Sequence, residues 1–253
     1  ALAALLGALL IQIGTNFSND YFDYIKGADT EERLGPVRVT QSGQVRPKTM
    51  LWNFVMVFGL ATLVGIYLVF RGGWPIVMIG ILSIASGILY TGGPWPLGYL
   101  GLGDLFVLIF FGPVAVGGTF YVQTLEITPV VIIAGLGPGL LATALLAVNN
   151  LRDEPTDKKV GKLTLAVRFG TTFARAEYLA ALVFSAVIPF ILAFWTETHW
   201  YACISALIII PGFSSIRQII SGVKGSELNI TLASTGKLIL IYGILFSLGW
   251  WIG

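Results

Sequence analysis

The stretch Asn16-Phe-Ser-Asn-Asp-Tyr-Phe-Asp-Tyr-Ile-Lys-Gly-Ala-Asp29 begins where a long apolar run, residues 1–17, comes to its end. A second polar stretch, Asn149-Asn-Leu-Arg-Asp-Glu-Pro-Thr-Asp157, ends another apolar run far downstream. Both stretches begin with the pattern Asn-x-x-x-Asp. We predict that the apolar runs cross a membrane and that the two acidic stretches face each other across a cavity embedded in it.

The composition indicates a chain that lies largely in lipid. Its 253 residues are 56% hydrophobic and only 11% charged, whereas soluble domains are about one quarter charged. A spanning helix needs about 20 mostly apolar residues, and only helices or closed barrels satisfy the backbone in lipid. The runs are too long and uniform for barrel strands. We therefore predict an all-α bundle, with spans at 1–17, 50–71, 74–91, 103–124, 128–150, 175–195, 199–220 and 235–253.

The distribution of charge predicts the orientation of the chain. When the segments between spans are assigned to alternate sides, all of the 15 Lys and Arg residues except Arg71 fall on one side. The positive-inside rule makes that side cytoplasmic, and both acidic stretches lie on it. The net charge of +2 gives no indication of nucleic-acid binding, and the single Cys203 excludes a disulfide.

The repeated Asn-x-x-x-Asp spacing indicates an internal duplication. Four spans separate the start of one stretch from the start of the next, so an even number of crossings returns the second to the same side in the same orientation. This is a parallel duplication, unlike the inverted repeats of many transporters. We predict one transmembrane domain over residues 1–253, built of two four-helix halves around a central cavity.

The polar side chains of each stretch can share one face of a helix. Residues three and four positions apart are neighbours, with about 5–6 Å between their Cβ atoms. The sets that share a face are Asn16, Asn19, Asp20 and Asp23, and, unless Pro155 loosens the last turn, Asn149, Asp153 and Asp157. Clustered carboxylates repel one another and need cations. Mg²⁺ prefers such hard oxygen donors together with phosphate oxygens, so the site fits a ligand with a phosphorylated head and an apolar tail.

Three other interpretations are open from the residues alone. The acids could be ordinary solvated side chains beside the membrane, although ionisable groups at membrane depth are commonly functional. A magnesium or organic-anion transporter would place its acids near the midplane, often in inverted repeats. A structural subunit of a membrane complex would not need paired clusters.

The motifs resemble those of the UbiA superfamily of intramembrane prenyltransferases over nearly the whole chain. Asn19-Asp-Tyr-Phe-Asp23 and Asp153-x-x-x-Asp157 are similar to its two aspartate-rich motifs. Several stretches are similar to its 1,4-dihydroxy-2-naphthoate prenyltransferase branch: the spacing from Asn16 to Asp29, Arg33-x-Gly-Pro-x-Arg38, Tyr90-Thr-Gly-Gly-Pro-Trp-Pro-Leu, Gly101-Leu-Gly-Asp-Leu-Phe, Asn149-Asn-Leu-Arg-Asp and Gly161-Lys-Leu-Thr-Leu-Ala-Val-Arg.

The chain departs from the superfamily pattern at three places. Gly27 stands where a further aspartate is frequent, and Pro94 stands where the pattern Tyr-x-x-x-Lys, started at Tyr90, has lysine. The superfamily usually has nine helices, so we expect its first helix, with any substrate contacts that it makes, to precede residue 1.

The resemblance implies a Mg²⁺-dependent enzyme. It would transfer a polyprenyl or phytyl group from its diphosphate to 1,4-dihydroxy-2-naphthoate, with loss of carbon dioxide and diphosphate, in menaquinone or phylloquinone biosynthesis. Hydroxybenzoate, homogentisate or a tetrapyrrole is the alternative acceptor. The reaction would take place within the lipid bilayer, with the site open to the cytoplasmic face.

The resemblance also implies roles for individual residues. One magnesium ion would be held by Asp20, Asp23 and Asp29, and the other by Asp153 and Asp157. The candidates to bind the diphosphate or the aromatic acid are Asn16, Asn19, Lys26, Arg38, Tyr90, Asn149, Asn150, Arg152, Lys158, Lys162 and Arg168. Asp104 is a candidate to deprotonate the hydroxyl of the acceptor, or a helix N-cap.

Overall fold

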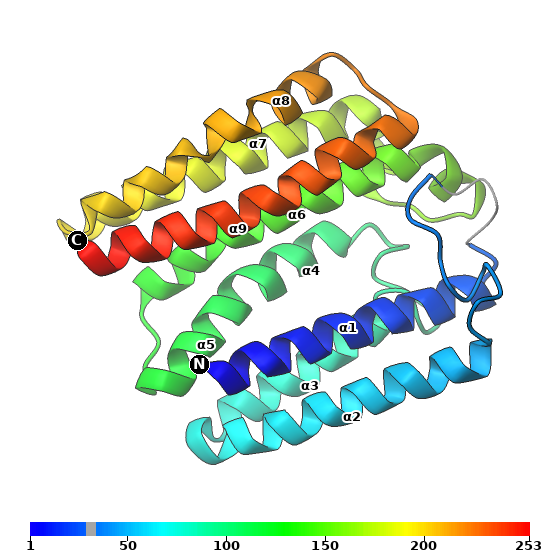
Figure 1. Cartoon of the computed structure of the whole chain (residues 1–253), viewed down its shortest axis with the longest axis horizontal. Helices are drawn as coiled ribbons and strands as arrows, with labels where there is room; N and C mark the ends of the chain where they lie inside the picture. Colours follow the sequence, from blue (N-terminus) through cyan, green and yellow to red (C-terminus); the bar gives the residue numbers. More distant parts are fainter. Residues whose placement is uncertain (29–33) are drawn as a thin grey trace. The chain divides into compact units, whose positions relative to one another are not determined.

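The computed structural model describes residues 1–28 and 34–253, and its elements are helices (Figure 1). Asp29 and Arg33 therefore lie outside the described residues. The α-helices are α1 (Leu2–Ile25), α2 (Pro47–Gly72), α3 (Trp74–Leu89), α4 (Gly103–Ile109), α5 (Ala115–Thr124), α6 (Pro129–Lys159), α7 (Leu165–Thr196), α8 (Ile209–Ile220) and α9 (Leu228–Ile252). The π-helix is η1 (Phe110–Val114), and the 3₁₀-helices are η2 (Trp200–Ile208) and η3 (Gly225–Glu227). The predicted all-α fold is confirmed.

Among the described residues, seven helical segments are long and apolar enough to cross a membrane, and α3 is a shorter apolar helix. Three of the seven join several elements, because α4, η1 and α5 form one segment, η2 and α8 form a second, and η3 and α9 form a third. Every predicted span therefore coincides with an apolar helical segment. The chain is an integral membrane protein.

The helices extend further than the apolar runs that predicted them. α1 continues to Ile25, and α6 continues through Pro155 to Lys159. α7 begins at Leu165, ten residues before the predicted span at 175–195, and turns at Gly170, where φ is 86°. Hydropathy marks the part of a helix that lies in lipid, whereas its hydrogen bonds continue into the polar region beyond.

The chain divides into two compact units. Unit 1 comprises residues 1–103, 118–127 and 156–164, and unit 2 comprises residues 104–117, 128–155 and 165–253. The units differ from the predicted four-span halves because α6 and the segment from α4 to α5 each contribute residues to both.

In unit 1, the helices α1, α2 and α3 pack side by side (Figure 1). Gly14 permits the closest approach of α1 to α2, because a Cβ atom there would lie 2.8 Å from the ring of Phe58. Phe54 and Phe58 continue a row of aromatic contacts that reaches Tyr21 and Phe22 near the end of α1. This packing holds the polar end of α1 on a rigid base.

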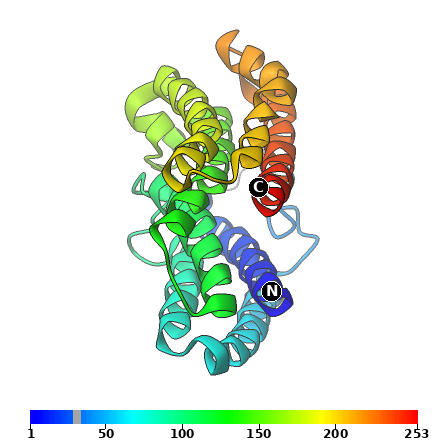
Figure 2. The same cartoon turned by 90° about the vertical axis from the view of Figure 1, so that its left-hand side faces the viewer.

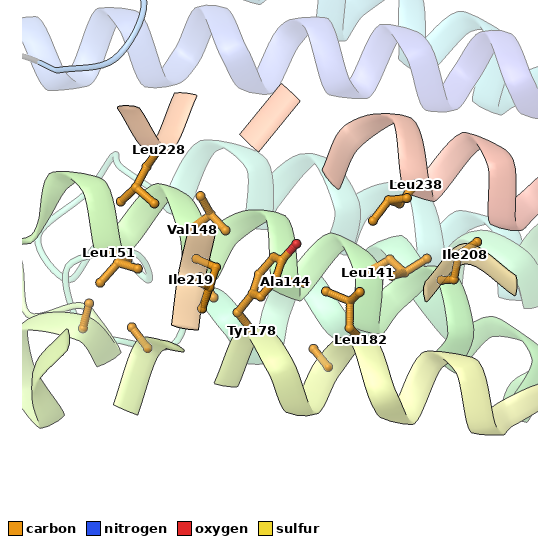
Figure 3. Close-up of a cluster of buried hydrophobic side chains, with 14 of the residues drawn as sticks. Leu141, Ala144, Val148, Leu151, Tyr178, Leu182, Ile208, Ile219, Leu228 and Leu238 are labelled. Atoms are coloured by element: carbon orange, nitrogen blue, oxygen red, sulfur yellow. The ribbon is translucent and has the colours of Figure 1, made fainter. Parts of the chain in front are cut away.

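Unit 2 has a core of buried side chains from α6, α7, η2, α8 and α9 (Figure 3). Its largest members are Tyr178 of α7 and Tyr242 of α9. The hydroxyl of Tyr178 lies 3.1 Å from that of Thr235 on α9, and both side chains are buried. η2 packs beside the end of α9, as Figure 2 shows. The core therefore fixes the helices that carry the second acidic stretch.

Three glycines bring η1 and α6 into backbone contact within unit 2. Gly112 has non-helical angles (φ −107°, ψ −108°) beside Pro113, which breaks the regular helix. A Cβ atom on Gly112 would lie 2.8 Å from the carbonyl oxygen of Gly135 and 3.1 Å from the Cα of Gly139. Small residues are common where helices approach closely in membranes, and here the absence of side chains lets the two backbones meet.

Replacing Gly135 with alanine should destabilise unit 2 by about 1–3 kcal/mol, because its Cβ would lie 2.9 Å from backbone atoms of Gly112 and Pro113 that cannot rotate away. The measurement is the melting temperature in detergent. Gly236→Ala on α9 is the matched control, since no atom lies within 4 Å of its Cβ position. Equal melting temperatures for the two variants would contradict the close crossing.

Candidate functional site

Asp23 lies in the last turn of α1, where a glycine ends the helix. The N–H of Gly27 donates to the carbonyl of Tyr24 at 3.0 Å, and that of Ala28 donates to the carbonyl of Asp23 at 2.9 Å. Gly27 has a left-handed φ of 65°. This pair of bonds with a left-handed glycine is a Schellman cap. The cap explains why glycine, rather than a further aspartate, occupies this position.

Asp157 has the same place at the end of α6. The N–H of Gly161 donates to the carbonyl of Lys158 at 3.3 Å, and that of Lys162 donates to the carbonyl of Asp157 at 2.9 Å. Gly161 again has a left-handed φ, of 71°. Both acidic stretches therefore end in Asp-x-x-x-Gly, with the aspartate as the residue whose carbonyl closes the cap.

This placement makes both carboxylates electrostatically costly. The C-terminal end of a helix carries about half a negative charge, and a further anion there is unfavourable by about 0.3–1 kcal/mol. Asp20, one turn before Asp23, is 5% exposed, and its Oδ1 accepts the Thr40 N–H at 3.3 Å. Such a concentration of negative charge is typical of a site for cations.

Two basic side chains lie beside these acids in unit 1. The Nη2 atom of Arg38 lies 3.7 Å from Oδ2 of Asp23, and the Nζ atom of Lys162 lies 3.3 Å from Oδ1 of Asp157. Both were predicted to contact the diphosphate. In this structure they partly neutralise the two helix-end carboxylates.

The segment from Tyr90 to Gly103 connects the two helix ends within unit 1. The hydroxyl of Tyr99 donates to Oδ1 of Asp23 at 3.3 Å, and the carbonyl of Tyr99 accepts the N–H of Leu163 at 3.0 Å. Leu163 directly follows the basic partner of Asp157. Tyr99 therefore links the first acidic stretch to the end of the second within unit 1, through its side-chain hydroxyl and its backbone carbonyl.

Lys26 and Asn19 also bind this segment. The Nζ atom of Lys26 donates to the carbonyl of Thr91 at 2.5 Å and lies 4.8 Å from the centre of the Tyr99 ring. The hydroxyl of Thr91 donates to Oδ1 of Asn19 at 2.9 Å. Partial burial lowers the pKa of the Lys26 ammonium, and the Asp23 carboxylate opposes that shift.

In unit 2, Arg152 is 1% exposed, and oxygen acceptors from three other residues surround its guanidinium. Its Nε and Nη2 atoms donate to the two carboxylate oxygens of Asp153 at 2.7 and 2.6 Å. Nη1 donates to Asn229 at the start of α9, and Nη2 also donates to Asn149, each at 2.7 Å. Arg152 was predicted to contact substrate, but its guanidinium is buried and holds the Asp153 carboxylate.

The other predicted residues occupy a range of environments. The backbone carbonyl of Tyr90 accepts a hydrogen bond from the N–H of Gly98 at 2.9 Å. Asn150 is buried in α6. The side chains that are exposed are those of Asn16, Lys158 and Arg168. Asp104 is the second residue of α4, so its interpretation as an N-cap is wrong. It is 6% exposed, and its Oδ1 has no hydrogen-bond partner among the described residues.

The acids of unit 1 fit Mg²⁺ by their chemistry. Within residues 1–28 and 34–253, no group of three or more His, Cys, Asp or Glu could hold a metal ion by itself. Mg²⁺ does not require such a group, because it usually binds one or two carboxylates together with waters and substrate phosphates. Asp20, Asp23 and Asp157 can supply the carboxylates, and the diphosphate of a ligand would supply the remaining oxygens.

The sequence did not reveal Tyr99, Thr91 or Asn229 as parts of the site. Tyr99 and Thr91 lie in a Gly- and Pro-rich loop, where an aromatic residue and a hydroxyl are unremarkable. Asn229 lies 77 positions from Arg152. The one available signal is that Asn229 is a polar amide beside the start of an apolar helix, and it does not indicate a partner.

The fold and the site together define a polytopic helical membrane protein with acidic helix ends and basic side chains suited to an anionic head group. Residues 1–230 match the UbiA prenyltransferase family. The chain belongs to this family, as its motifs predicted, and its class of reaction is accordingly prenyl transfer.

Curated relatives of this family are similar over most of their length. A protein of Haemophilus influenzae named 1,4-dihydroxy-2-naphthoate octaprenyltransferase is 39% identical, over 98% of this chain and 83% of its own. The protein of the same name from Mycobacterium tuberculosis is 38% identical, over 96% of this chain and 82% of its own. That from Escherichia coli is 36% identical, over 98% and 83%.

Replacing Gly27 with alanine should destabilise the end of α1 by about 1–2 kcal/mol, because a side chain makes a left-handed residue costly while no atom obstructs its Cβ. The melting temperature in detergent measures this effect. Gly59→Ala within α2, where the Cβ position is equally open, should leave it unchanged or slightly higher. The cap assignment fails if Gly27→Ala melts like Gly59→Ala.

Replacing Arg152 with alanine should cost about 3–5 kcal/mol, because Asp153 would remain as a buried carboxylate without its guanidinium partner. The midpoint of unfolding in detergent is the readout. Arg217→Ala on α8 removes an exposed arginine of the same unit and should have little effect. Similar losses for both variants would show that the Arg152 network contributes no special stability.

Proposed function

We propose that this chain transfers a polyprenyl group from its diphosphate to 1,4-dihydroxy-2-naphthoate, releasing diphosphate and carbon dioxide. The observation that carries the proposal is the presence, in one compact unit, of two capped helix ends whose acids are Asp20, Asp23 and Asp157. The acceptor is inferred from the names of relatives that are 36–39% identical to this chain.

A diphosphate can bind to these acids only if its charge is offset. Asp20, Asp23 and Asp157 would hold Mg²⁺, which supplies Lewis-acid stabilisation of the leaving diphosphate. Arg38 and Lys162 lie within 4 Å of two of these carboxylates and contribute fixed positive charge at the same place. Arg38 and Lys162 can stabilise the diphosphate without first changing conformation, because the carboxylates of Asp23 and Asp157 already hold them in place.

The bond changes follow from this arrangement. The C–O bond of the prenyl diphosphate breaks, and its electron pair leaves with the diphosphate, so that an allylic cation remains. The ring carbon that carries the carboxyl group attacks the cation and forms the new C–C bond. Loss of carbon dioxide and a proton from the acid then restores the aromatic ring. An apolar membrane environment protects the cation from water.

Asp104 is our candidate for the acceptor of a proton from the substrate hydroxyl. It is almost fully buried in unit 2, and its Oδ1 has no hydrogen-bond partner among the described residues. A buried carboxylate oxygen without a hydrogen-bond donor is costly, so a hydroxyl from a substrate would remove that cost by donating to it.

We further propose that the site opens to the cytoplasm, on the basis of the side to which nearly all Lys and Arg residues are assigned.

The test is turnover by the purified protein with dihydroxynaphthoate and a series of prenyl diphosphates, with products identified by mass spectrometry. Asp20→Asn should lower kcat/KM by roughly 10²–10³-fold, the effect of removing one charge-stabilising group. EDTA should abolish the reaction, and added Mg²⁺ should restore it. Glu126→Gln, an exposed acid of the same unit, is the control.

Near wild-type turnover by Asp20→Asn, or full activity in chelator, would reject the proposed site. A protein that prenylates hydroxybenzoate, homogentisate or a tetrapyrrole but leaves dihydroxynaphthoate unchanged would retain the reaction class and reject the acceptor.

A further inference from the structure

Tyr99 is the residue on which the contacts of unit 1 converge. Its hydroxyl donates to Oδ1 of Asp23, its ring lies beneath the Lys26 ammonium at 4.8 Å, and its carbonyl accepts the N–H of Leu163 at 3.0 Å. The three contacts use three different parts of the residue. They reach the end of α1 from one direction and the segment after α6 from the other.

From these contacts we infer that Tyr99 positions the Asp23 carboxylate for its ligand and couples the two acidic helix ends. The inference rests on the proposed function. Asp23 has two oxygens with different neighbours: Oδ1 accepts from the Tyr99 hydroxyl, and Oδ2 faces Arg38 at 3.7 Å. The hydroxyl therefore sets the rotation of the carboxylate and fixes which oxygen is presented to a cation.

The ring and the carbonyl make this positioning rigid. A cation above the face of an aromatic ring is attracted to it, so the ring keeps Lys26 beside Asp23 while Nζ donates to the Thr91 carbonyl. The bond from Leu163 fixes the backbone of Tyr99 against the residue that follows Lys162. A shift of either helix end would consequently reach the other through Tyr99.

Substitutions at Tyr99 can separate the contribution of its hydroxyl from that of its ring. Tyr99→Phe removes the hydroxyl but keeps the ring and the carbonyl. Tyr99→Leu removes the ring as well. Tyr67→Phe, which removes an exposed hydroxyl from α2 of the same unit, is the matched control.

The measurement is equilibrium binding of the unreactive analogue farnesyl S-thiolodiphosphate to detergent-purified protein at a series of Mg²⁺ concentrations, with the unliganded melting temperature recorded in parallel. Tyr99→Phe should weaken Mg²⁺-dependent binding about tenfold, as expected for loss of a hydrogen bond to a charged group. It should also raise the Mg²⁺ concentration needed for half-saturation. Tyr99→Leu should bind more weakly still.

The outcomes distinguish this inference from the proposed function. If wild-type protein does not bind the analogue with Mg²⁺, the proposed function fails. If it binds, but Tyr99→Phe binds equally well or only melts at a lower temperature without a change in its Mg²⁺ midpoint, Tyr99 is merely structural and the inference is overturned.

Discussion

The site depends on the way two helices end. α1 and α6 both terminate in a left-handed glycine cap, and in both the residue whose carbonyl closes the cap is an aspartate. The negative end of a helix is where a carboxylate is least stable, so the chain places its acids where only a neighbouring positive charge can offset them. Arg38 and Lys162 supply part of that charge. A cation brought by a ligand would supply more, and affinity for such a ligand follows from the same unfavourable placement.

The two acidic stretches resemble each other most clearly at this local level. Asp23-x-x-x-Gly27 and Asp157-x-x-x-Gly161 repeat the same cap, and Asn-x-x-x-Asp precedes each. The compact units do not repeat in the same way, because unit 1 includes the residues after Pro155 while Asp153 belongs to unit 2. The surroundings of the two stretches have also diverged. Asp20 accepts a backbone N–H from Thr40, whereas Asp153 is held by both arms of a buried arginine.

Much of this could be predicted from the sequence, and the remainder has physical reasons. Long apolar runs predict helices in lipid, and the i, i+4 spacing predicts that Asp153 and Asp157 share a face, which α6 confirms by continuing through Pro155. The starts of α7 and α9 were predicted less well, because amphipathic residues such as those at 165–174 can form a helix without being apolar. Tyr99, the partner of Asp23, and Asn229, the partner of Arg152, lie more than 70 residues from the side chains that they contact. The spacing of residues in a single sequence does not reveal such contacts.

The ion pair between Arg152 and Asp153 is buried within unit 2. Arg152 is adjacent to Asp153 in sequence, and adjacent residues do not normally face each other on a helix. The long guanidinium can nevertheless fold back onto its neighbour because Asn149 and Asn229 accept its remaining N–H groups. Without those two amides, a guanidinium at 1% exposure would carry unsatisfied donors. Asn149, the first residue of the second stretch, therefore has a structural role in unit 2. It helps to hold Arg152 in place, and Arg152 in turn holds Asp153.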